Sequence, residues 1–333
     1  MGFHTRVVRS LSYNSWHNQA LEAWLLDQVG EDEVILYLWQ NQHTVFIGRH
    51  QNPWKECRCE ELEATGGRLC RRLSGGGAVY HDLGNLNFTF VLKKKHYDLR
   101  RQSSVILEAV KSLGINAEFT GRNDMTVDGR KFSGNAFYHG KNGSYHHGTV
   151  MIGIDPEQLT KYLQVSKEKM AAKGVDSVRS RTVNLNTLRP SLTVEEMAVA
   201  LEKSFAAIYG KPAAYDTFNG TDTFDGWYEK FSSREWQYGH TPQFDITYQT
   251  RFPWGGIELG LTVENATISS ATIFSDAMNA TLISELADGM RGLPFNLDAI
   301  AQWLGSFPAA EEDRPAVDDL KAWLLAKSGE ARG

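Results

Sequence analysis

Apolar and polar residues recur along this 333-residue chain with two periods, one typical of helices and one typical of strands. In residues 14–29 the apolar positions recur every three or four residues, which predicts an amphipathic helix capped by Asn14 or Ser15. The runs Glu33–Trp39 and Thr44–Ile47 are rich in β-forming residues, and a short polar turn separates them. They are therefore predicted to form an antiparallel hairpin.

The following segments carry the same two signals, together with residues that end helices and form tight turns. Helices are predicted at 52–67, 99–113, 156–163, 167–172 and Val194–Tyr209. Strands are predicted at 78–81 and 86–92, and as short runs between 117 and 154 with hairpin turns at Asp128-Gly129 and Asn142-Gly143. Because helices and strands do not alternate regularly, we predict an α+β fold of mixed, largely antiparallel sheets flanked by helices.

A second module is predicted to begin near residue 245. Three strand-like runs at 244–251, 257–263 and 267–274 are followed by helical patterns at 281–290, 297–304 and 316–326. No linker stands out by composition. The predicted domains are residues 1–244 and 245–333.

Composition narrows the class of protein. The apolar fraction of 41% and the charged fraction of 23% are those of a globular domain. The net charge of −5 is uneven, because residues 250–333 contain six Lys/Arg and twelve Asp/Glu. This balance gives no nucleic-acid-binding signature, and no segment reads as a signal peptide or membrane span. An odd count of three cysteines favours reduced thiols, so we expect a cytoplasmic protein without membrane or nucleic-acid partners.

The candidate chemistry begins at the glycine-rich stretch 71–82, Arg-Arg-Leu-Ser-Gly-Gly-Gly-Ala-Val-Tyr-His-Asp. Glycines allow backbone amides to approach an anion closely, and arginine supplies forked donors suited to phosphate. Taken alone, three glycines more often form a turn with solvated arginines. A second polar stretch, Gly-Arg-Asn-Asp at 121–124 followed by Arg-Lys-Phe-Ser-Gly-Asn-Ala at 130–136, favours a ligand site instead.

These motifs, together with Lys-Gly-Val-Asp-Ser-Val-Arg-Ser-Arg at 173–181, resemble lipoate–protein ligases in order and spacing. The resemblance covers most of the chain and includes the C-terminal accessory domain of the long bacterial form. It implies a catalytic domain like those of class II synthetases and biotin ligases, followed by a smaller α+β domain.

The resemblance also implies an activity. Such enzymes use ATP and Mg²⁺ to convert lipoate or octanoate into an acyl adenylate, and then acylate a lysine of an acceptor. The implied acceptors are lipoyl domains of 2-oxoacid dehydrogenase E2 subunits and the glycine-cleavage H protein. We expect the ligase itself to be a monomer.

Family positions carry over residue by residue. The implied ATP-binding residues are Arg72, Gly77, Ala78, Val79, Tyr80, Asn123, Asp124 and Lys131. The implied lipoate-binding residues are Trp39, Ser74, Gly75, Gly76, His81, Lys131, Tyr145 and His147. Lys173, Arg179 and Arg181 are implied to lie on a loop that closes over the adenylate and protects it from water.

Lys131 is the predicted catalytic residue. A fixed cation at the α-phosphate stabilises the charge that builds up when a carboxylate attacks phosphorus, and Gly129 and Gly134 would leave room for close approach. An isolated lysine is more often simply exposed. Asp124 could bind Mg²⁺ through its oxygens or form an Asx-turn with Asn123, and the sequence does not decide between these.

Two other functions remain open at this point. An octanoyltransferase of the same fold would pass the acyl group through a cysteine thioester without ATP, but Cys57, Cys59 and Cys70 lie outside any motif expected of that chemistry. A non-catalytic lipoate or nucleotide binder would form no adenylate. Biotin ligation is disfavoured by the glycine-rich loop, and no P-loop motif is present.

Overall fold

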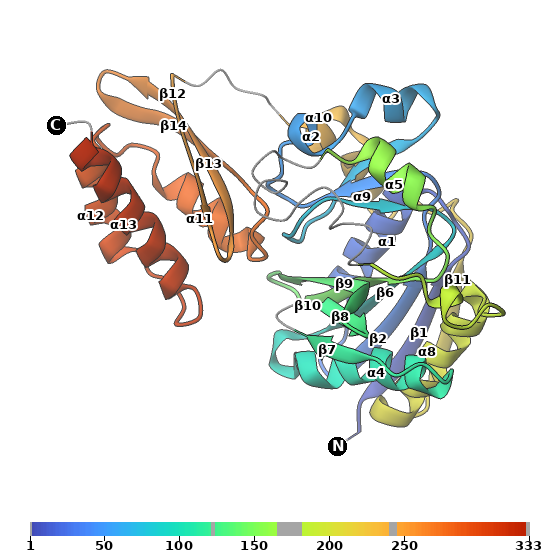
Figure 1. Cartoon of the computed structure of the whole chain (residues 1–333). Coiled ribbons are helices and arrows are strands. Elements are labelled where there is room, and N and C mark those ends of the chain that lie inside the picture. The colour runs from blue at the N-terminus through green and yellow to red at the C-terminus, as the bar shows by residue number, and fades with distance from the viewer. Residues whose placement is uncertain (1, 121–123, 165–181, 240–244, 331–333) are drawn as a thin grey trace. The chain divides into compact units, whose positions relative to one another are not determined.

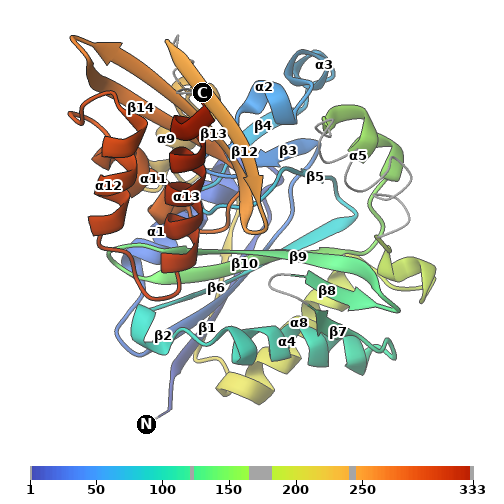
Figure 2. The ribbon, with the colours of Figure 1, turned by 60° about the vertical axis from the view of Figure 1, so that its left-hand side comes forward.

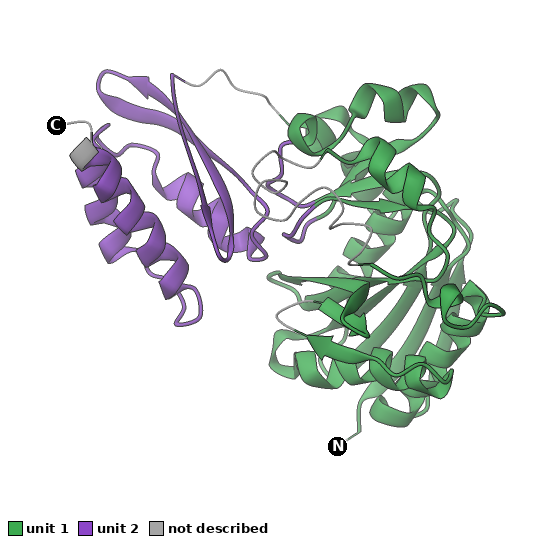
Figure 3. Ribbon diagram, viewed as in Figure 1, with its two compact units in different colours: residues 1–47, 53–72, 78–239 green, residues 48–52, 73–77, 240–333 purple. Residues whose placement is uncertain are grey.

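The computed structural model describes residues 2–120, 124–164, 182–239 and 245–330, and its contacts divide the chain into two compact units (Figure 3). The first unit contains Met1–Ile47, Pro53–Arg72 and Ala78–Gly239. The second contains Gly48–Asn52, Leu73–Gly77 and His240–Gly333. The sequence pattern suggested a division after residue 244 and gave no sign that two short loops would group with the C-terminal residues.

The larger sheet of the first unit has eight strands, in the order β11-β1-β2-β6-β10-β9-β8-β7 (Figure 1). Strand β1 pairs in parallel with β2 and β11, whereas the other neighbours are antiparallel. The predicted α+β class with mixed, largely antiparallel sheets is therefore confirmed. The strands are β1 His4–Ser10, β2 Glu33–Trp39, β6 Asn85–Leu92, β7 Glu118–Thr120, β8 Asp124–Val127, β9 Arg130–His139, β10 Ser144–Met151 and β11 Ala214–Phe218.

Helices cover both faces of this sheet, and the face under α4 (Leu99–Ser112) and α8 (Val194–Tyr209) is apolar. On that face Leu36, Phe88 and Phe90 join the main core (Figure 2). Helix α1 (Ser15–Gln28) contacts the opposite face of β6. It begins as predicted, with the Asn14 side chain accepting a hydrogen bond from the Trp16 amide at 3.0 Å.

The predicted hairpin of Glu33–Trp39 and Thr44–Ile47 is wrong. Strand β3 (Thr44–Ile47) belongs to a separate three-stranded sheet, between β4 (Arg68–Arg71) and β5 (Val79–His81). Both edges of β2 are already paired, with β1 on one side and β6 on the other. The intervening residues therefore lead the chain away, and His43 takes a left-handed conformation with φ of 45°.

Other elements around the second sheet also differ from the prediction. The helix expected at 52–67 is two short helices, α2 (Pro53–Glu56) and α3 (Cys59–Ala64), because Cys57 forms a β-bridge with Leu163. Helix α5 (Pro156–Tyr162) confirms another prediction, whereas the helix expected at 167–172 lies outside the described residues. The pattern missed β1, β4, β11, α9 (Trp227–Ser232), α10 (Arg234–Tyr238) and two short 3₁₀ turns, Lys94–His96 and Leu185–Thr187.

The second unit contains an antiparallel sheet of β12 (Ile246–Phe252), β13 (Gly255–Glu264) and β14 (Thr267–Ser275). Helices α11 (Ala280–Gly289), α12 (Leu297–Ser306) and α13 (Arg314–Glu330) follow it, and a shared apolar core joins them to the sheet. These strands and helices agree with the prediction to within a few residues. Across the described parts of both units, no helix is long and apolar enough to cross a membrane.

Candidate functional site

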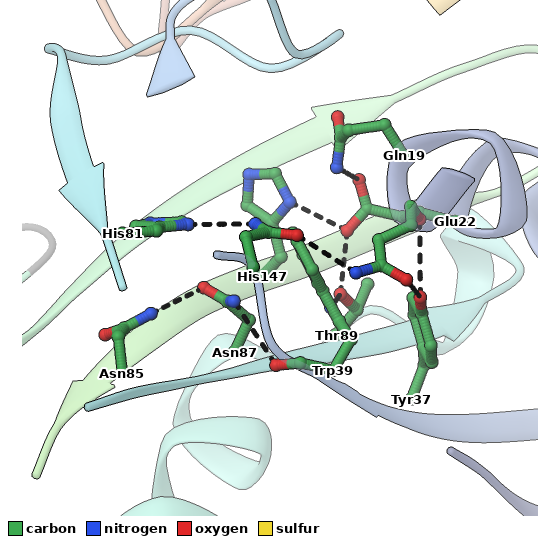
Figure 4. Close-up of polar contacts among 11 residues, drawn as sticks. Gln19, Glu22, Tyr37, Trp39, His81, Asn85, Asn87, Thr89 and His147 are labelled. Atoms are coloured by element: carbon green, nitrogen blue, oxygen red, sulfur yellow. Dashed lines mark hydrogen bonds and ion pairs between the residues drawn. The ribbon is translucent and has the colours of Figure 1, made fainter. Parts of the chain in front are cut away.

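Strand register places a row of polar side chains on the sheet face that α1 covers. Tyr37 on β2 pairs with Thr89 on β6, and Thr89 pairs with His147 on β10. Glu22 projects from α1 onto this row (Figure 4), accepting hydrogen bonds from Thr89 Oγ1 at 2.7 Å and from His147 Nδ1 at 2.8 Å. Gln19 Nε2 donates to its second oxygen at 3.0 Å. Three donors thus stabilise a carboxylate that is only 1% exposed.

Four predicted lipoate-binding residues lie around this polar row. Trp39 donates from Nε1 to Thr89 Oγ1 at 3.0 Å, and the Tyr145 ring lies 4.8 Å from that of His147. The His81 ring stacks on Phe46 at 4.8 Å, and Phe46 in turn lies 6.0 Å from Trp39. Trp39, His81, Tyr145 and His147 are all buried. The tertiary structure therefore brings these four side chains, from three strands, into one aromatic and polar cluster, which we call the Glu22 cluster.

Burial shifts the pKa values of His81 and of Arg72, whose charge acts on His81. Burial lowers the pKa of Arg72 to about 10, so the guanidinium remains a cation at neutral pH. Burial, together with the charge of Arg72, lowers the pKa of His81 to about 3, so that imidazole is neutral. The neutral imidazole of His81 is therefore subject to the charge of a buried cation, the Arg72 guanidinium.

Lys131 lies on the hairpin of β8 and β9. Its ammonium Nζ lies 2.6 Å from Asp124 Oδ1, and both side chains are partly exposed. The hairpin turns at Asp128 and Gly129, with φ of 50° and 73°, so Gly129 provides a left-handed turn residue. A Cβ at Gly134 would lie 3.0 Å from Lys131 Nζ, so the absence of a side chain there leaves room for the ammonium.

A pocket opens beside the backbone of Lys131. The Lys131 carbonyl accepts a hydrogen bond from the Val183 amide at 2.9 Å, and Lys131 forms a β-bridge with Thr182. The pocket has a volume of about 240 Å³ and a mainly apolar wall with a few polar groups. Its lining residues are Arg130, Met151, Ile154, Pro156, Leu159, Thr182, Val183, Asn184 and Thr187.

The glycine-rich loop is divided between the two units. In the second unit, the Gly76 amide donates to the Ala277 carbonyl at 3.0 Å, and the Arg49 amide donates to the Ser74 carbonyl at 2.9 Å. A Cβ at Gly75 would lie 2.1 Å from the Ala277 carbonyl oxygen, so close packing against this backbone requires glycine there. In the described conformation at least one loop amide is thus bonded within the protein.

The structure describes only some of the other residues predicted to bind the nucleotide or to cover the adenylate. Ala78 leads into β5, where Val79 pairs with Phe46 and Tyr80 pairs with Val45. The Tyr80 hydroxyl lies 2.9 Å from His43 Nδ1. Gly77 belongs to the second unit. The predicted site residues Asn123, Lys173, Arg179 and Arg181 lie outside the described residues.

The cysteines are poor candidates for a thioester nucleophile. Cys57, Cys59 and Cys70 are all buried and reduced. Burial raises the pKa of Cys70 far above its usual range, which keeps the thiol protonated. A hydrogen bond between Cys57 and Cys59 raises the pKa of Cys57 and lowers that of Cys59, but both side chains stay inside a hydrophobic cluster.

Sequence reasoning missed Glu22, which lies at the centre of the cluster. The amphipathic pattern of residues 14–29 implied that the polar side of the helix faces solvent, yet His17, Asn18, Gln19 and Glu22 are all buried. A weak signal was present, because Ser15–Gln28 contains no lysine or arginine. A solvated helix face usually carries such residues.

Two protein-family models match this chain, and together they cover most of it. Residues 14–206 match the model of the lipoyl protein ligase A/B catalytic domain, and residues 241–324 match that of the bacterial lipoate protein ligase C-terminus. The chain is 30% identical to P. falciparum LipL1, solved in complex with lipoate, with a TM-score of 0.85 over 97% of this chain and 99% of that one.

Two further solved structures share the fold. A bipartite lipoate protein ligase from Thermoplasma acidophilum, studied with its E2 lipoyl domain, is 24% identical, with a TM-score of 0.63 over 74% of this chain and 100% of that one. A lipoate-protein ligase A bound with ATP is also 24% identical, with a TM-score of 0.60 over 72% of this chain and 99% of that one.

Proposed function

Because the chain belongs to the lipoyl protein ligase A/B family and carries the bacterial ligase C-terminal domain, we propose that it is an ATP-dependent lipoate–protein ligase. Lipoate or octanoate is first activated as the acyl adenylate and then transferred to a lysine of an acceptor domain. The ligands of related structures support this proposal, since LipL1 was solved with lipoate and a lipoate-protein ligase A with ATP.

The observation that carries the proposal is that the Lys131 ammonium lies next to Asp124 and that the Lys131 backbone borders a pocket. In the first step a carboxylate oxygen attacks the α-phosphorus of ATP, the bond to the β-phosphate oxygen breaks, and pyrophosphate leaves. Negative charge rises on the α-phosphoryl oxygens, and the Lys131 ammonium stabilises it. Asp124, 2.6 Å away, holds that ammonium on the hairpin before the substrates bind.

We assign the nucleotide to the side of the molecule where the pocket beside Lys131 lies. Met151, Ile154 and Val183 supply an apolar wall suited to a flat base, and Asn184 supplies a polar group. Arg72, Gly77, Ala78, Val79, Tyr80 and Asn123 remain proposed nucleotide contacts. The loop with Lys173, Arg179 and Arg181 is proposed to exclude water from the adenylate.

Mg²⁺ is proposed to arrive with ATP. Among the residues that the structure describes, no three His, Cys, Asp or Glu side chains gather into a metal site. Asp124 is proposed to supply a protein oxygen, and the phosphates would supply most of the other ligands. When bound, the ion would neutralise charge on the phosphates.

In the second step the neutral ε-amine of an acceptor lysine attacks the acyl carbonyl. The bond from the carbonyl carbon to the AMP oxygen breaks, AMP leaves, and the amine proton passes to solvent. The proposed acceptors are lipoyl domains of E2 subunits and the glycine-cleavage H protein. The Glu22 cluster is proposed to line the acyl site, and Ser74, Gly75 and Gly76 remain proposed lipoate contacts.

The decisive experiment measures pyrophosphate release with lipoate and ATP. Release should require lipoate, and Lys131→Ala should reduce its rate about a hundredfold or more, as expected for loss of a charge contact in the transition state. Lys141→Ala, in an exposed turn, is the matched control and should retain the rate. Equal rates for the two variants would remove Lys131 from its role. Acylation of a lipoyl domain without ATP would instead favour an octanoyltransferase.

A further inference from the structure

Asn18, Asn41 and His81 form a chain of hydrogen bonds. Contacts of Asn18 with backbone carbonyl groups determine which atom donates in each bond. Asn18 Nδ2 donates to the carbonyl oxygens of Ser12 and Gln40, at 2.9 and 2.7 Å. A carbonyl oxygen accepts only, so this nitrogen is identified without ambiguity. Asn18 Oδ1 correspondingly accepts from the hydroxyls of Ser10 and Tyr37, at 2.6 and 3.3 Å.

The orientation of Asn18 determines that of Asn41. Asn18 Nδ2 also lies 3.0 Å from Asn41 Oδ1 and shares one of its two hydrogens with it, so the side-chain carbonyl of Asn41 faces Asn18. The reverse orientation would set two amide NH₂ groups against each other. Asn41 Nδ2 therefore points away, and it lies 3.0 Å from His81 Nδ1. Asn41 donates this hydrogen bond, and His81 Nδ1 accepts it.

The proton of the His81 imidazole must then be on Nε2. Since the ring is neutral and Nδ1 accepts, Nε2 carries the hydrogen. His81 is only 3% exposed, and its Nε2 has no hydrogen-bond partner among the residues that the structure describes. A buried donor without an acceptor is destabilising, so such a group in a native protein requires an explanation.

We propose that Asn41 holds His81 as an Nε2–H donor for a sulfur of the lipoyl ring, which makes this pair a determinant of lipoate over octanoate. The inference rests on the proposed function. His81 stacks on Phe46 in aromatic surroundings. Burying a charged acceptor there would be costly, so the neutral His81 donor suits a weak, neutral acceptor better. A ring sulfur is such an acceptor. Octanoate has only methylene and methyl groups in the corresponding part of its chain.

Histidine-selective ¹⁵N NMR tests the hydrogen-bond chain without any need for activity. In the wild type, His81 should carry hydrogen on Nε2 and not on Nδ1. Asn41→Asp supplies an acceptor in place of a donor and should place a hydrogen on Nδ1, whereas the matched change Asn142→Asp in an exposed turn should not. Lipoate should shift the Nε2–H resonance more than octanoate does. A wild-type ring protonated on Nδ1 would overturn the inference.

Kinetics test the specificity. His81→Phe keeps a stacking ring and removes the donor, so the ratio of kcat/KM for lipoate to that for octanoate should fall about five- to tenfold. His81→Gln supplies an amide N–H and should recover part of this ratio. An unchanged ratio, or equal losses with both acids, would place the acceptor elsewhere and overturn the inference. If no acid releases pyrophosphate in the wild type, the proposed function fails, and the NMR result still decides the donor assignment.

Discussion

At the scale of single residues, the buried carboxylate of Glu22 connects four elements of the first unit. It accepts from Thr89, His147 and Gln19, and Thr89 also accepts from Trp39. The main consequence is that this carboxylate cannot be removed without leaving several buried donors unpaired. Removing one partner of such a buried, hydrogen-bonded group destabilises the folded state, because the remaining polar groups stay buried without a partner.

Glu22→Ala should therefore lower the free energy of unfolding by about 3–5 kcal/mol, measured by chemical denaturation. Glu22→Gln keeps the shape and one acceptor oxygen, so its effect should be smaller. Glu108→Ala, on the exposed side of α4, is the control and should change stability by less than about 0.5 kcal/mol. If Glu22→Ala were as stable as the control, the cluster would have no structural role.

Gly134 is a second position where one atom matters. Gly134→Ala would place a Cβ about as close as 3.0 Å to the Lys131 ammonium and should displace it from Asp124. Pyrophosphate release should fall about tenfold or more, because small misplacements of catalytic groups have large effects on rate. Gly30→Ala, whose Cβ meets only ordinary contacts, should retain the rate. A normal rate in Gly134→Ala would mean that the ammonium does not act from this position.

At the scale of elements, the β8–β9 hairpin positions both members of the Lys131–Asp124 pair. Strand β8 begins at Asp124, and Lys131 is the second residue of β9. The left-handed turn between the strands therefore fixes the distance between the two charges. A bulge at Met125–Thr126 shifts the register close to Asp124.

Gly129→Val should disturb this turn, because a β-branched residue is strained at φ of 73°. We expect a loss of about 1–2 kcal/mol in stability together with slower pyrophosphate release. Asp128→Asn is the matched control, since asparagine tolerates the left-handed region, and it should change neither quantity much. Thermal unfolding and the pyrophosphate assay on the same samples would reveal whether the two effects occur together.

At the scale of the whole molecule, two loops from the N-terminal part of the sequence belong to the C-terminal unit. The His50 ring lies 2.8 Å from the Ala280 carbonyl and 3.1 Å from Ser284 Oγ, and the His50 carbonyl accepts from the Ser275 amide at 2.8 Å. Gly76 is bonded to Ala277 in the same way. The second unit thus orders part of the glycine-rich loop.

Truncation after residue 239 should release that order. Amide hydrogen exchange of a peptide covering 73–77 should accelerate at least tenfold, because the Gly76 amide loses its acceptor, which corresponds to about 1.4 kcal/mol of local stability. A peptide covering Asn85–Leu92, in the centre of the eight-stranded sheet, is the internal control and should remain protected. Slow exchange in both peptides would show that the first unit orders the loop by itself.

The sequence predicted most helices and strands and the turns at Asp128-Gly129 and Asn142-Gly143. These features depend on local periodicity and on residues with special backbone preferences, so they can be read from short windows. The family resemblance carried Trp39, His81, Tyr145 and His147 as ligand residues, and the structure places those four together. It could not supply Glu22 or Asn41, because no motif contains them.

By itself, then, the sequence determined the element types, the α+β class and the chemistry of the motifs, since these follow from side chains and their spacing. Three features were decided only by the tertiary structure. The segment Thr44–Ile47 does not pair with β2 but joins another sheet, the polar side of α1 is buried, and two loops group with the C-terminal unit. The physical reason is that strand pairing and burial depend on segments far apart in the chain. A polar residue has the same identity in water or in a core, and only its packing neighbours decide which environment surrounds it.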